Sequence, residues 1–262
     1  MKVSKLICGG NPLSGHSHAH ENLDWEMIDF YTMPHIQALW KECERLGINT
    51  IQTRGDPHMM RAFHEHRLNG GALQWIAQTA TEFSNTRAHI HLIQRYGAHA
   101  IYVHGSNTDR HWKEGRIDEI GELLREIRDT GLPGGLGTHI PEVIEYAEEK
   151  GWETDFYMGC FYNLSREFKA LPGVDSNPYK NERFLKEDPL RMTSTLRQVN
   201  KPCLGFKILA AGRNCSTPEQ TKEAFRFAIR SLKKDDAIVV GVFQKYKNEL
   251  EENVRWILEA LD

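Results

Sequence analysis

A short apolar run followed by an amphipathic stretch recurs along nearly the whole chain, and this alternation limits the possible folds more than any other feature. Each run is brief, partly β-branched or aromatic, and ends at glycine or a polar residue, as strands do. The eight runs are "KLICGG", "INTIQT", "LQWIAQ", "HAIYVH", "PGGLGT", "TDFYMGC", "PCLGFKI" and "AIVVGV". Eight strand-helix units within 262 residues favour a TIM barrel of the α/β class, a (β/α)8 fold, over an open doubly wound sheet. We therefore predict one barrel domain over residues 1–262.

Two of the stretches between the runs carry clear helix boundaries. In residues 34–47, "PHIQALWKECERLG", Pro34 suits a first helical turn and Gly47 a helix end. In residues 217–232, "TPEQTKEAFRFAIRSL", Thr217 is the expected N-cap and Pro218 opens the first turn. The pattern predicts a helix over each stretch.

One connection is much longer than the others. Residues 163–188, "NLSREFKALPGVDSNPYKNERFLKED", form a polar segment after the sixth predicted strand. Long loops in compact domains are either functional lids or disordered segments. On a barrel this loop would lie over the C-terminal mouth, where active sites are built. We therefore interpret residues 163–188 as a long loop or lid.

Composition limits the partners of the protein. Its 33 basic and 36 acidic residues give a net charge of -3, which provides no electrostatic footprint for nucleic acid or an anionic membrane. No apolar stretch approaches the ~20 residues of a membrane span, and the first residues do not resemble a signal peptide. The five cysteines are odd in number and lack CxxC spacing, which argues against disulfides and thiolate zinc sites. We expect a cytoplasmic protein with a small-molecule substrate, able to form homo-oligomers through its barrel helices.

The order of the motifs resembles that of the aldo-keto reductase superfamily over most of the chain. "VSKLICGGNPLSG" is similar to the opening strand of that family, "RLGINTIQTRGD" to its second strand, and "AIYVHG" to its fourth strand, which ends in histidine. "GLGTHIPEVIEYAEEKG" resembles the fifth strand and its helix, and "GCFYNL" the sixth strand. The segment from "GFKILAAGRNCSTPEQ" to "ENVRWIL" resembles the part of the family that holds a nicotinamide cofactor. The resemblance implies a TIM barrel and, as one alternative, bound NAD(P).

The catalytic tetrad of that family is mostly missing here. Gln52 stands at the position of the family's aspartate and Thr79 at that of its lysine, and no tyrosine follows the second strand. Gly159 lies near the position of the glutamine that holds the nicotinamide amide. Only His104 remains, and a lone imidazole lacks the tuned proton donor that carbonyl reduction needs. The resemblance therefore implies a divergent barrel whose reductase chemistry has been lost.

Polar residues at the predicted strand ends define a candidate site, because the last side chains of barrel strands reach the mouth. His104 ends the fourth strand and is the central candidate. Arg54 follows the second strand and suits a carboxylate or phosphate clamp. Lys207 ends the seventh strand and would either neutralise a buried carboxylate or act as a Schiff base or enolate stabiliser. The residues expected to bind substrate are Asn11, Gln52, Gln78, Phe206 and Lys245.

Further histidines raise the question of a metal site. "GHSHAH" places His16, His18 and His20 at alternate positions in the opening loop. If this loop folds over the mouth, His18 could join His104 and His139 as three neutral ligands of zinc, manganese or nickel with an open position. A solvent-facing loop is the alternative interpretation of these residues.

The remaining chemistry-bearing residues are expected to be structural. The histidines at positions 64, 66, 89 and 91 are interpreted as solvated residues of helices. Asp56, Asp109 and Glu142 are interpreted as helix caps or first-turn acids. Gly159 and Phe161 are assigned the inward positions of the sixth strand, so the Cys160 thiol is expected to face the helix layer.

Three hypotheses about function follow from the sequence. The first is a non-redox lyase, isomerase or hydrolase that acts on a small carbonyl or sugar-derived compound, with His104 central and a divalent metal assisting. The second is an NAD(P)H-dependent aldo-keto reductase with an atypical site. The third is a barrel without catalytic activity that serves as a binding subunit.

Overall fold

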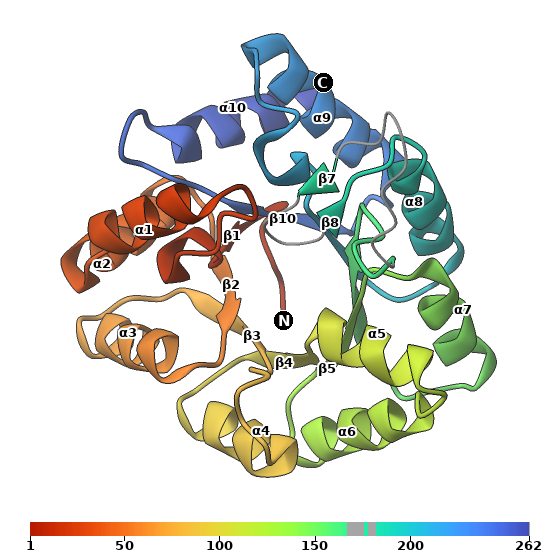
Figure 1. Cartoon of the computed structure of the whole chain (residues 1–262). Coiled ribbons are helices and arrows are strands. Elements are labelled where there is room, and N and C mark those ends of the chain that lie inside the picture. The colour runs from red at the N-terminus through yellow and green to blue at the C-terminus, as the bar shows by residue number, and fades with distance from the viewer. Residues whose placement is uncertain (167–175, 178–181, 262) are drawn as a thin grey trace.

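Eight parallel strands close into a barrel in the computed structural model, which describes residues 1–166, 176–177 and 182–261 (Figure 1). The order around the barrel is β1-β10-β9-β6-β5-β4-β3-β2. The strands are β1 (Leu6–Gly9), β2 (Thr50–Arg54), β3 (Gln74–Gln78), β4 (Ala100–Val103), β5 (Gly134–Thr138), β6 (Phe156–Cys160), β9 (Cys203–Phe206) and β10 (Ala237–Gly241). Each strand coincides with one of the eight apolar runs to within a few residues. The predicted TIM barrel is confirmed.

Helices surround the barrel and cover its outer face (Figure 1). They are α1 (Glu21–Phe30), α2 (Met33–Arg45), α3 (Pro57–Leu68), α4 (Thr86–Arg95), α5 (Gly105–Lys113), α6 (Asp118–Asp129), α7 (Pro141–Glu149), α8 (Asp188–Gln198), α9 (Pro218–Ser231) and α10 (Glu249–Leu261). The two predicted helices are α2 and α9. Gly47 follows α2 with φ +77°, a conformation that glycine adopts without steric cost. The Thr217 side chain caps α9 by accepting a hydrogen bond from the Gln220 N–H.

Two apolar layers hold the barrel together. Alternate strand positions fill its interior, whose buried side chains are Ile7, Ile76, Ala100, Tyr102, Phe156, Met158, Leu204, Ala237 and Val239. A larger layer between strands and helices includes the fully buried rings of Trp40, Phe63 and Trp75. Burial of apolar surface in these two layers is the main stabilising contribution. The packed interior forms the floor beneath the mouth.

The inward positions of β6 differ from the prediction. A Cβ atom on Gly159 would lie 2.9 Å from Leu196 Cδ1 of α8, so Gly159 faces the helix layer. Phe156 and Met158 belong to the interior cluster, whereas Cys160 belongs to the larger cluster that includes helix side chains. The prediction that Gly159 takes an inward position is wrong, whereas the direction of the Cys160 thiol stays a prediction. The thiol is fully buried, and burial raises its pKa well above the ordinary value.

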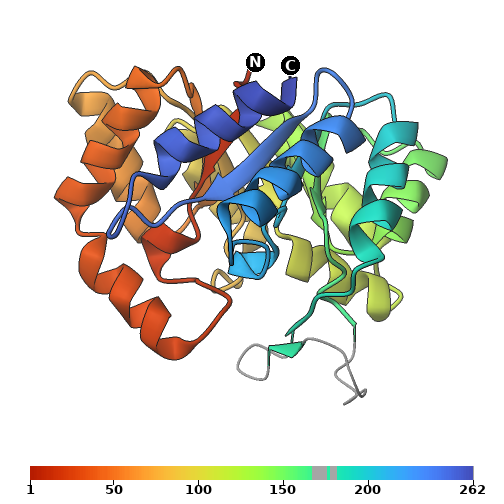
Figure 2. The ribbon, with the colours of Figure 1, turned by 90° about the horizontal axis from the view of Figure 1, so that it is seen from above.

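The long connection after β6 contains a two-stranded antiparallel sheet, β7 (Ser176–Asn177) and β8 (Glu182–Arg183). The predicted lid over residues 163–188 lies partly outside the described residues. Figure 2 shows β7 and β8 at the end of the molecule opposite both termini. This end is the C-terminal mouth, because β1 runs from the N-terminal side toward it.

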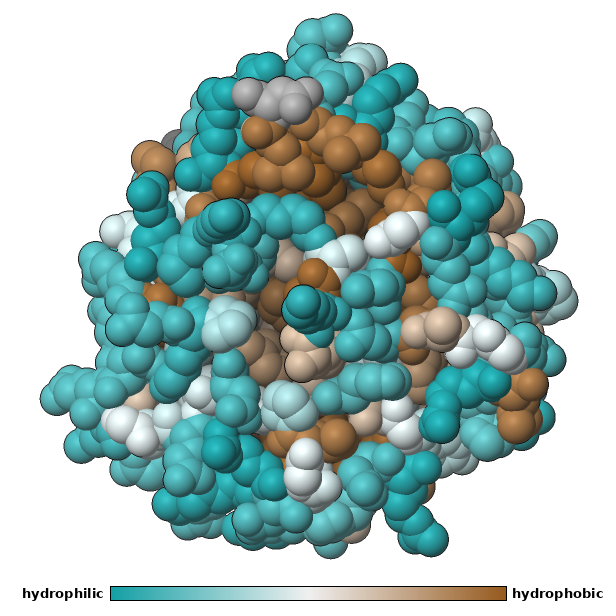
Figure 3. Space-filling model, turned by 180° about the vertical axis from the view of Figure 1, so that it is seen from behind, coloured by the Kyte–Doolittle hydropathy of each residue, from teal (hydrophilic) through white to brown (hydrophobic). Residues whose placement is uncertain are grey.

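The face opposite the mouth carries a hydrophobic area on the side where α9 and α10 lie (Figure 3). Leu258 and Leu261 of α10 are 59% and 57% exposed. Homo-oligomer formation stays a prediction. None of the helices in the described ranges is long and apolar enough to cross a membrane.

Candidate functional site

His104 lies at the junction between β4 and α5, where it is the N-cap of the helix. Its backbone N–H donates to Thr79 Oγ1 at 3.0 Å, which fixes the junction to the end of β3. The Ser106 N–H donates to His104 Nδ1 at 3.0 Å. Because Nδ1 accepts this hydrogen bond, the neutral ring carries its proton on Nε2. His104 therefore offers an N–H donor.

The charge state of His104 follows from its surroundings. Burial, the neighbouring His139 and the Arg54 guanidinium together lower the pKa of His104 to about 3. The ring is therefore neutral at any physiological pH. A neutral imidazole at a helix N-terminus can polarise a carbonyl oxygen without transferring a full proton.

The low pKa of His104 predicts a dependence of stability on pH. Below pH ~6.5 the unfolded chain binds a proton on this histidine while the folded protein does not, so the free energy of unfolding falls by about 1.4 kcal/mol per pH unit down to the folded pKa of about 3. His104→Gln lacks this contribution. Between pH 7.5 and 5.5 we expect wild type to lose about 1.4 kcal/mol more stability than the variant, measured by urea unfolding. Equal losses of stability in wild type and His104→Gln would contradict the low pKa of His104.

His139 follows β5 and is held by a buried carboxylate. Its Nδ1 lies 2.6 Å from Asp109 Oδ2, and Asp109 is 1% exposed. The same carboxylate accepts hydrogen bonds from the hydroxyls of Thr138 and Ser165, each at 2.5 Å. Burial acts to raise the pKa of Asp109, but His139 and the hydroxyl hydrogen bonds hold it below its ordinary value. The ionised carboxylate orients the His139 ring with Nδ1–H toward Asp109 and leaves Nε2 to accept a proton.

The two imidazoles are neighbours with opposite proton arrangements. A Cβ atom on Gly105, the residue after His104, would lie 3.2 Å from His139 Cε1. His104 carries a proton on Nε2, whereas His139 has a basic Nε2. Enzymes that move a proton within a carbonyl compound use this arrangement, in which one group accepts a proton and its neighbour donates a hydrogen bond.

Gly105 allows the close approach of the two histidines, which gives a second prediction. In Gly105→Ala the new methyl group displaces the His139 ring by a few tenths of an ångström. We expect activity to fall about three- to tenfold, because small misplacements of reacting groups are costly. Thermal stability should hold or rise, since alanine favours helix. Ser106→Ala, a change in the same turn that keeps the backbone N–H, is the control, and an equal loss of activity in it would contradict this view.

Arg54 and Gln78, at the ends of β2 and β3, are engaged with protein groups. The Arg54 guanidinium forms an ion pair with Glu82, and its Nε lies 3.6 Å from Asp56 Oδ2. The Gln78 amide donates to the Tyr102 hydroxyl at 2.8 Å inside the barrel. These contacts fix the wall of the mouth beside His104.

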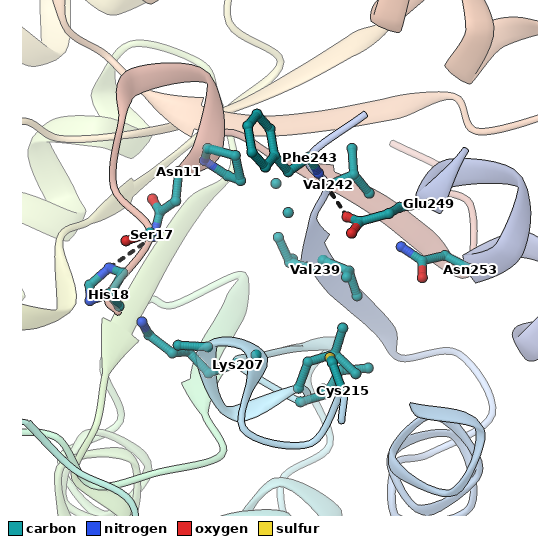
Figure 4. A pocket seen from close by; sticks show the side chains of 18 of the residues that line it. Asn11, Ser17, His18, Lys207, Cys215, Val239, Val242, Phe243, Glu249 and Asn253 are labelled. Carbon is teal, nitrogen blue, oxygen red and sulfur yellow. Dashed lines mark hydrogen bonds between the residues drawn. The ribbon is translucent and has the colours of Figure 1, made fainter. Parts of the chain in front are cut away.

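A cavity of about 320 Å³ opens between β1, β9, β10 and the start of α10, and neither His104 nor His139 lines it (Figure 4). Five of the residues predicted to act at the site line it, namely Asn11, His18, Gln52, Phe206 and Lys207. The Phe206 ring lies edge-on to His139, with 5.7 Å between centroids. Phe206 therefore lies between the cavity and His139.

Two of the predicted residues pair with carboxylates. Lys245 does not line the cavity and pairs with Glu26 at 2.6 Å. His18 lines the cavity, but its Nδ1 lies 2.7 Å from Glu182 Oε1 and its Nε2 lies 3.2 Å from Asn11 Nδ2. Among the residues that the structure describes, no group of three or more His, Cys, Asp or Glu side chains could hold a metal ion. The structure does not bring His18, His104 and His139 together as a ligand set.

Sequence reasoning missed Asp109 and Glu182 and misjudged two histidines. Asp109 was interpreted as a cap, although it lies five residues after His104 on the helix beside β5. His66 and His89 were interpreted as solvated, yet each is 1% exposed. His66 lies 3.2 Å from Glu44 Oε1, and His89 Nε2 lies 2.6 Å from the Gly55 carbonyl. Both are satisfied core histidines.

Comparison with known proteins supports the architecture. No family model matches the chain. The chain is similar in structure to a truncated form of 3-deoxy-D-arabino-heptulosonate 7-phosphate synthase from Thermotoga maritima, with a TM-score of 0.58 and 14% sequence identity over 98% of this chain and 86% of that chain. At this identity the likeness shows the fold alone. The chain thus has a TIM-barrel fold, and no finding links it to the aldo-keto reductases specifically.

Proposed function

We propose that the protein is a non-redox enzyme that moves a proton within a small carbonyl or sugar-derived compound, as an isomerase or lyase does. The observation that supports this most is the pair of neighbouring imidazoles with opposite proton arrangements, one of them oriented by a buried carboxylate. A hydrolase would need a group that activates water at the same site, and no observation assigns that role to a described residue.

The roles follow from the proton positions. His139 Nε2 removes the proton from the carbon next to the substrate carbonyl, and Asp109 stabilises the imidazolium that forms. The electron pair of the broken C–H bond moves into the new carbon–carbon double bond, and the carbonyl oxygen gains negative charge. His104 Nε2–H donates a hydrogen bond to that oxygen. The proton on His139 then returns to a different atom, or a neighbouring bond breaks.

Proton exchange tests this proposal without knowledge of the product. Purified protein is incubated in D₂O with dihydroxyacetone, hydroxyacetone, D-erythrulose and D-xylulose, and loss of the α-proton signal is followed by NMR. We expect exchange on at least one compound. No exchange above the rate of a His139→Ala control on any of them would overturn the proposal.

The metal part of the sequence hypothesis has less support. A zinc, manganese or nickel ion would need His18 Nδ1 or Nε2, and both are engaged with Glu182 and Asn11. The donor set therefore does not fit a metal held by His18, His104 and His139, and no step above depends on one. Elemental analysis of wild type and His104→Ala, purified without chelator, tests this, and stoichiometric metal lost in the variant would restore the metal hypothesis.

The cavity favours a second candidate, a nicotinamide-dependent reductase. It extends from Phe206 to α10, and its apolar walls at Val239 and Val242 fit a flat ring. Lys245, which is predicted to bind substrate, does not line this cavity, and Lys247, which does, pairs with Glu252 at 2.7 Å. A fluorescence titration with NADPH tests this candidate. Micromolar binding would favour the reductase over the proton-transfer enzyme.

A further inference from the structure

Glu182 is a largely buried carboxylate on β8, next to the candidate site. Its side chain is 12% exposed, and its Oε1 lies 2.7 Å from His18 Nδ1. The charges of Lys207 and His139 both act on it, which places it near the ends of β9 and β5. Glu182 therefore belongs to the same mouth as the two imidazoles, although it comes from the connection after β6.

The hydrogen bonds to Glu182 have one consistent direction. The Asn11 amide Nδ2 donates to His18 Nε2 at 3.2 Å, so the proton of a neutral His18 is on Nδ1 and is donated to Glu182 Oε1. Burial and the charge of Lys207 lower the pKa of His18, which keeps the ring neutral. This chain of hydrogen bonds satisfies Oε1 only.

The second carboxylate oxygen has no such partner. Glu182 Oε2 is buried and accepts no hydrogen bond from any residue that the structure describes. Burial acts to raise the pKa of Glu182, but the His18 hydrogen bond and Lys207 hold it below the ordinary value, so the group is ionised. A buried acceptor without a donor is unfavourable, and a charged one more so. Among the described residues, this oxygen is therefore open to a donor from a ligand.

The backbone beside Glu182 is held in an unusual conformation. His18 has φ +58° and Lys207 has φ +61°, values that non-glycine residues rarely adopt. Residues in this region cluster at ligand-binding sites because the surrounding structure must enforce them. In Figure 4 the Lys207 amino group points toward His18 at the wall of the cavity. Both strained residues line the cavity.

The charges select the kind of ligand. Glu182 and Lys207 together are neutral, so the missing donor need not be a cation. An ammonium has three N–H donors, so Lys207 can donate to a ligand while it keeps its contacts with the protein. A ligand satisfies both groups if one of its hydroxyls donates to Glu182 Oε2 and a neighbouring oxygen accepts from Lys207. Two oxygens on adjacent carbons can supply this donor and this acceptor.

We propose that Glu182 and Lys207 bind a vicinal diol or hydroxy-carbonyl unit, so that the substrate of the proposed proton-transfer reaction, on which this inference rests, is a polyhydroxylated aldehyde or ketone. Glu182 is thus a specificity-determining residue supplied by β8. It accepts from the hydroxyl, and Lys207 donates to the neighbouring oxygen.

Binding of unreactive polyols tests the inference apart from catalysis. Xylitol, which has vicinal hydroxyls, and 1,5-pentanediol, which has none, are titrated into wild type, Glu182→Gln and Lys207→Gln, and binding is measured by calorimetry and saturation-transfer NMR. We expect wild type to bind xylitol and not 1,5-pentanediol, and each variant to bind xylitol about ten- to a hundredfold more weakly. Glu187→Gln, which changes an exposed acid at the start of α8, should bind as wild type does.

The outcomes separate this inference from the proposed function. Absence of xylitol binding, or equal binding by wild type and both variants, would overturn the diol site even if proton exchange is observed. Binding that depends on Glu182, together with no proton exchange, would leave the diol site standing and refute the proposed reaction. Lys207→Gln provides an independent test if Glu182→Gln does not fold, as judged by thermal unfolding.

Discussion

His104→Ala lowers the rate of proton exchange on the active carbonyl compound by about 10²- to 10³-fold, because it removes the donor that stabilises the developing oxyanion. His104→Gln should retain more activity than the alanine variant, since a glutamine amide can also donate a hydrogen bond. The measurement is the exchange rate by NMR in D₂O under saturating substrate, with thermal unfolding as a check on folding.

The comparison of the two variants tests the neutral state of the ring. A histidine that cycles through an imidazolium cannot be replaced by glutamine, so the two variants would then be equally inactive. The low pKa of His104, about 3, argues for a donor that stays neutral throughout the reaction. Equal inactivity of His104→Ala and His104→Gln would therefore contradict the role assigned to His104, although not the importance of the residue.

Asp109→Asn should lower activity further, by about 10³- to 10⁴-fold. The amide replaces an acceptor by a donor, so the His139 ring turns or moves its proton to Nε2, where it can no longer accept one. Thr138 and Ser165 also lose an ionised acceptor, and we expect a loss of stability of about 2 kcal/mol. Exchange kinetics and urea unfolding measure the two effects.

Ser165→Ala is the matched control for Asp109→Asn. It removes one of the donors to Asp109 but leaves the carboxylate ionised and the His139 ring oriented. Its activity should fall no more than about tenfold. If Asp109→Asn keeps most of the wild-type exchange rate, His139 is not the base, and the proposed mechanism is wrong.

The barrel was predictable because its signal is local. Each strand is a short apolar run with its own boundaries, and helix boundaries such as Thr217 and Gly47 depend on neighbouring residues alone. His104 and Lys207 were found in the same way, from their positions at strand ends. The side of the sheet that a strand residue faces is predicted less securely than the position of the strand, since an error of one residue reverses the direction of every side chain, as at Gly159.

The partners of the site residues were much harder to predict. Asp109 and His139 come from adjacent units of the barrel, so a search for acids one helical turn after a strand end would have found the pair. Glu182 lies in a connection without periodicity, and no sequence pattern relates it to His18. His89 shares a helix face with the buried Ile90 and Ile93. This pattern indicates a buried position for His89, although the polarity of histidine favours an exposed one.

The pairing of β1 with β10 has a consequence for how the protein folds in the cell. Leu6 lies opposite Ile238, so the barrel closes through contacts between residues more than 200 positions apart. Contacts of such long range form slowly. Until β10 leaves the ribosome, the first strand has an open edge, and open strand edges are templates for aggregation. A nascent chain shorter than about 240 residues is therefore the form most in need of chaperones, and a truncation that removes β10 exposes the edge of β1 permanently.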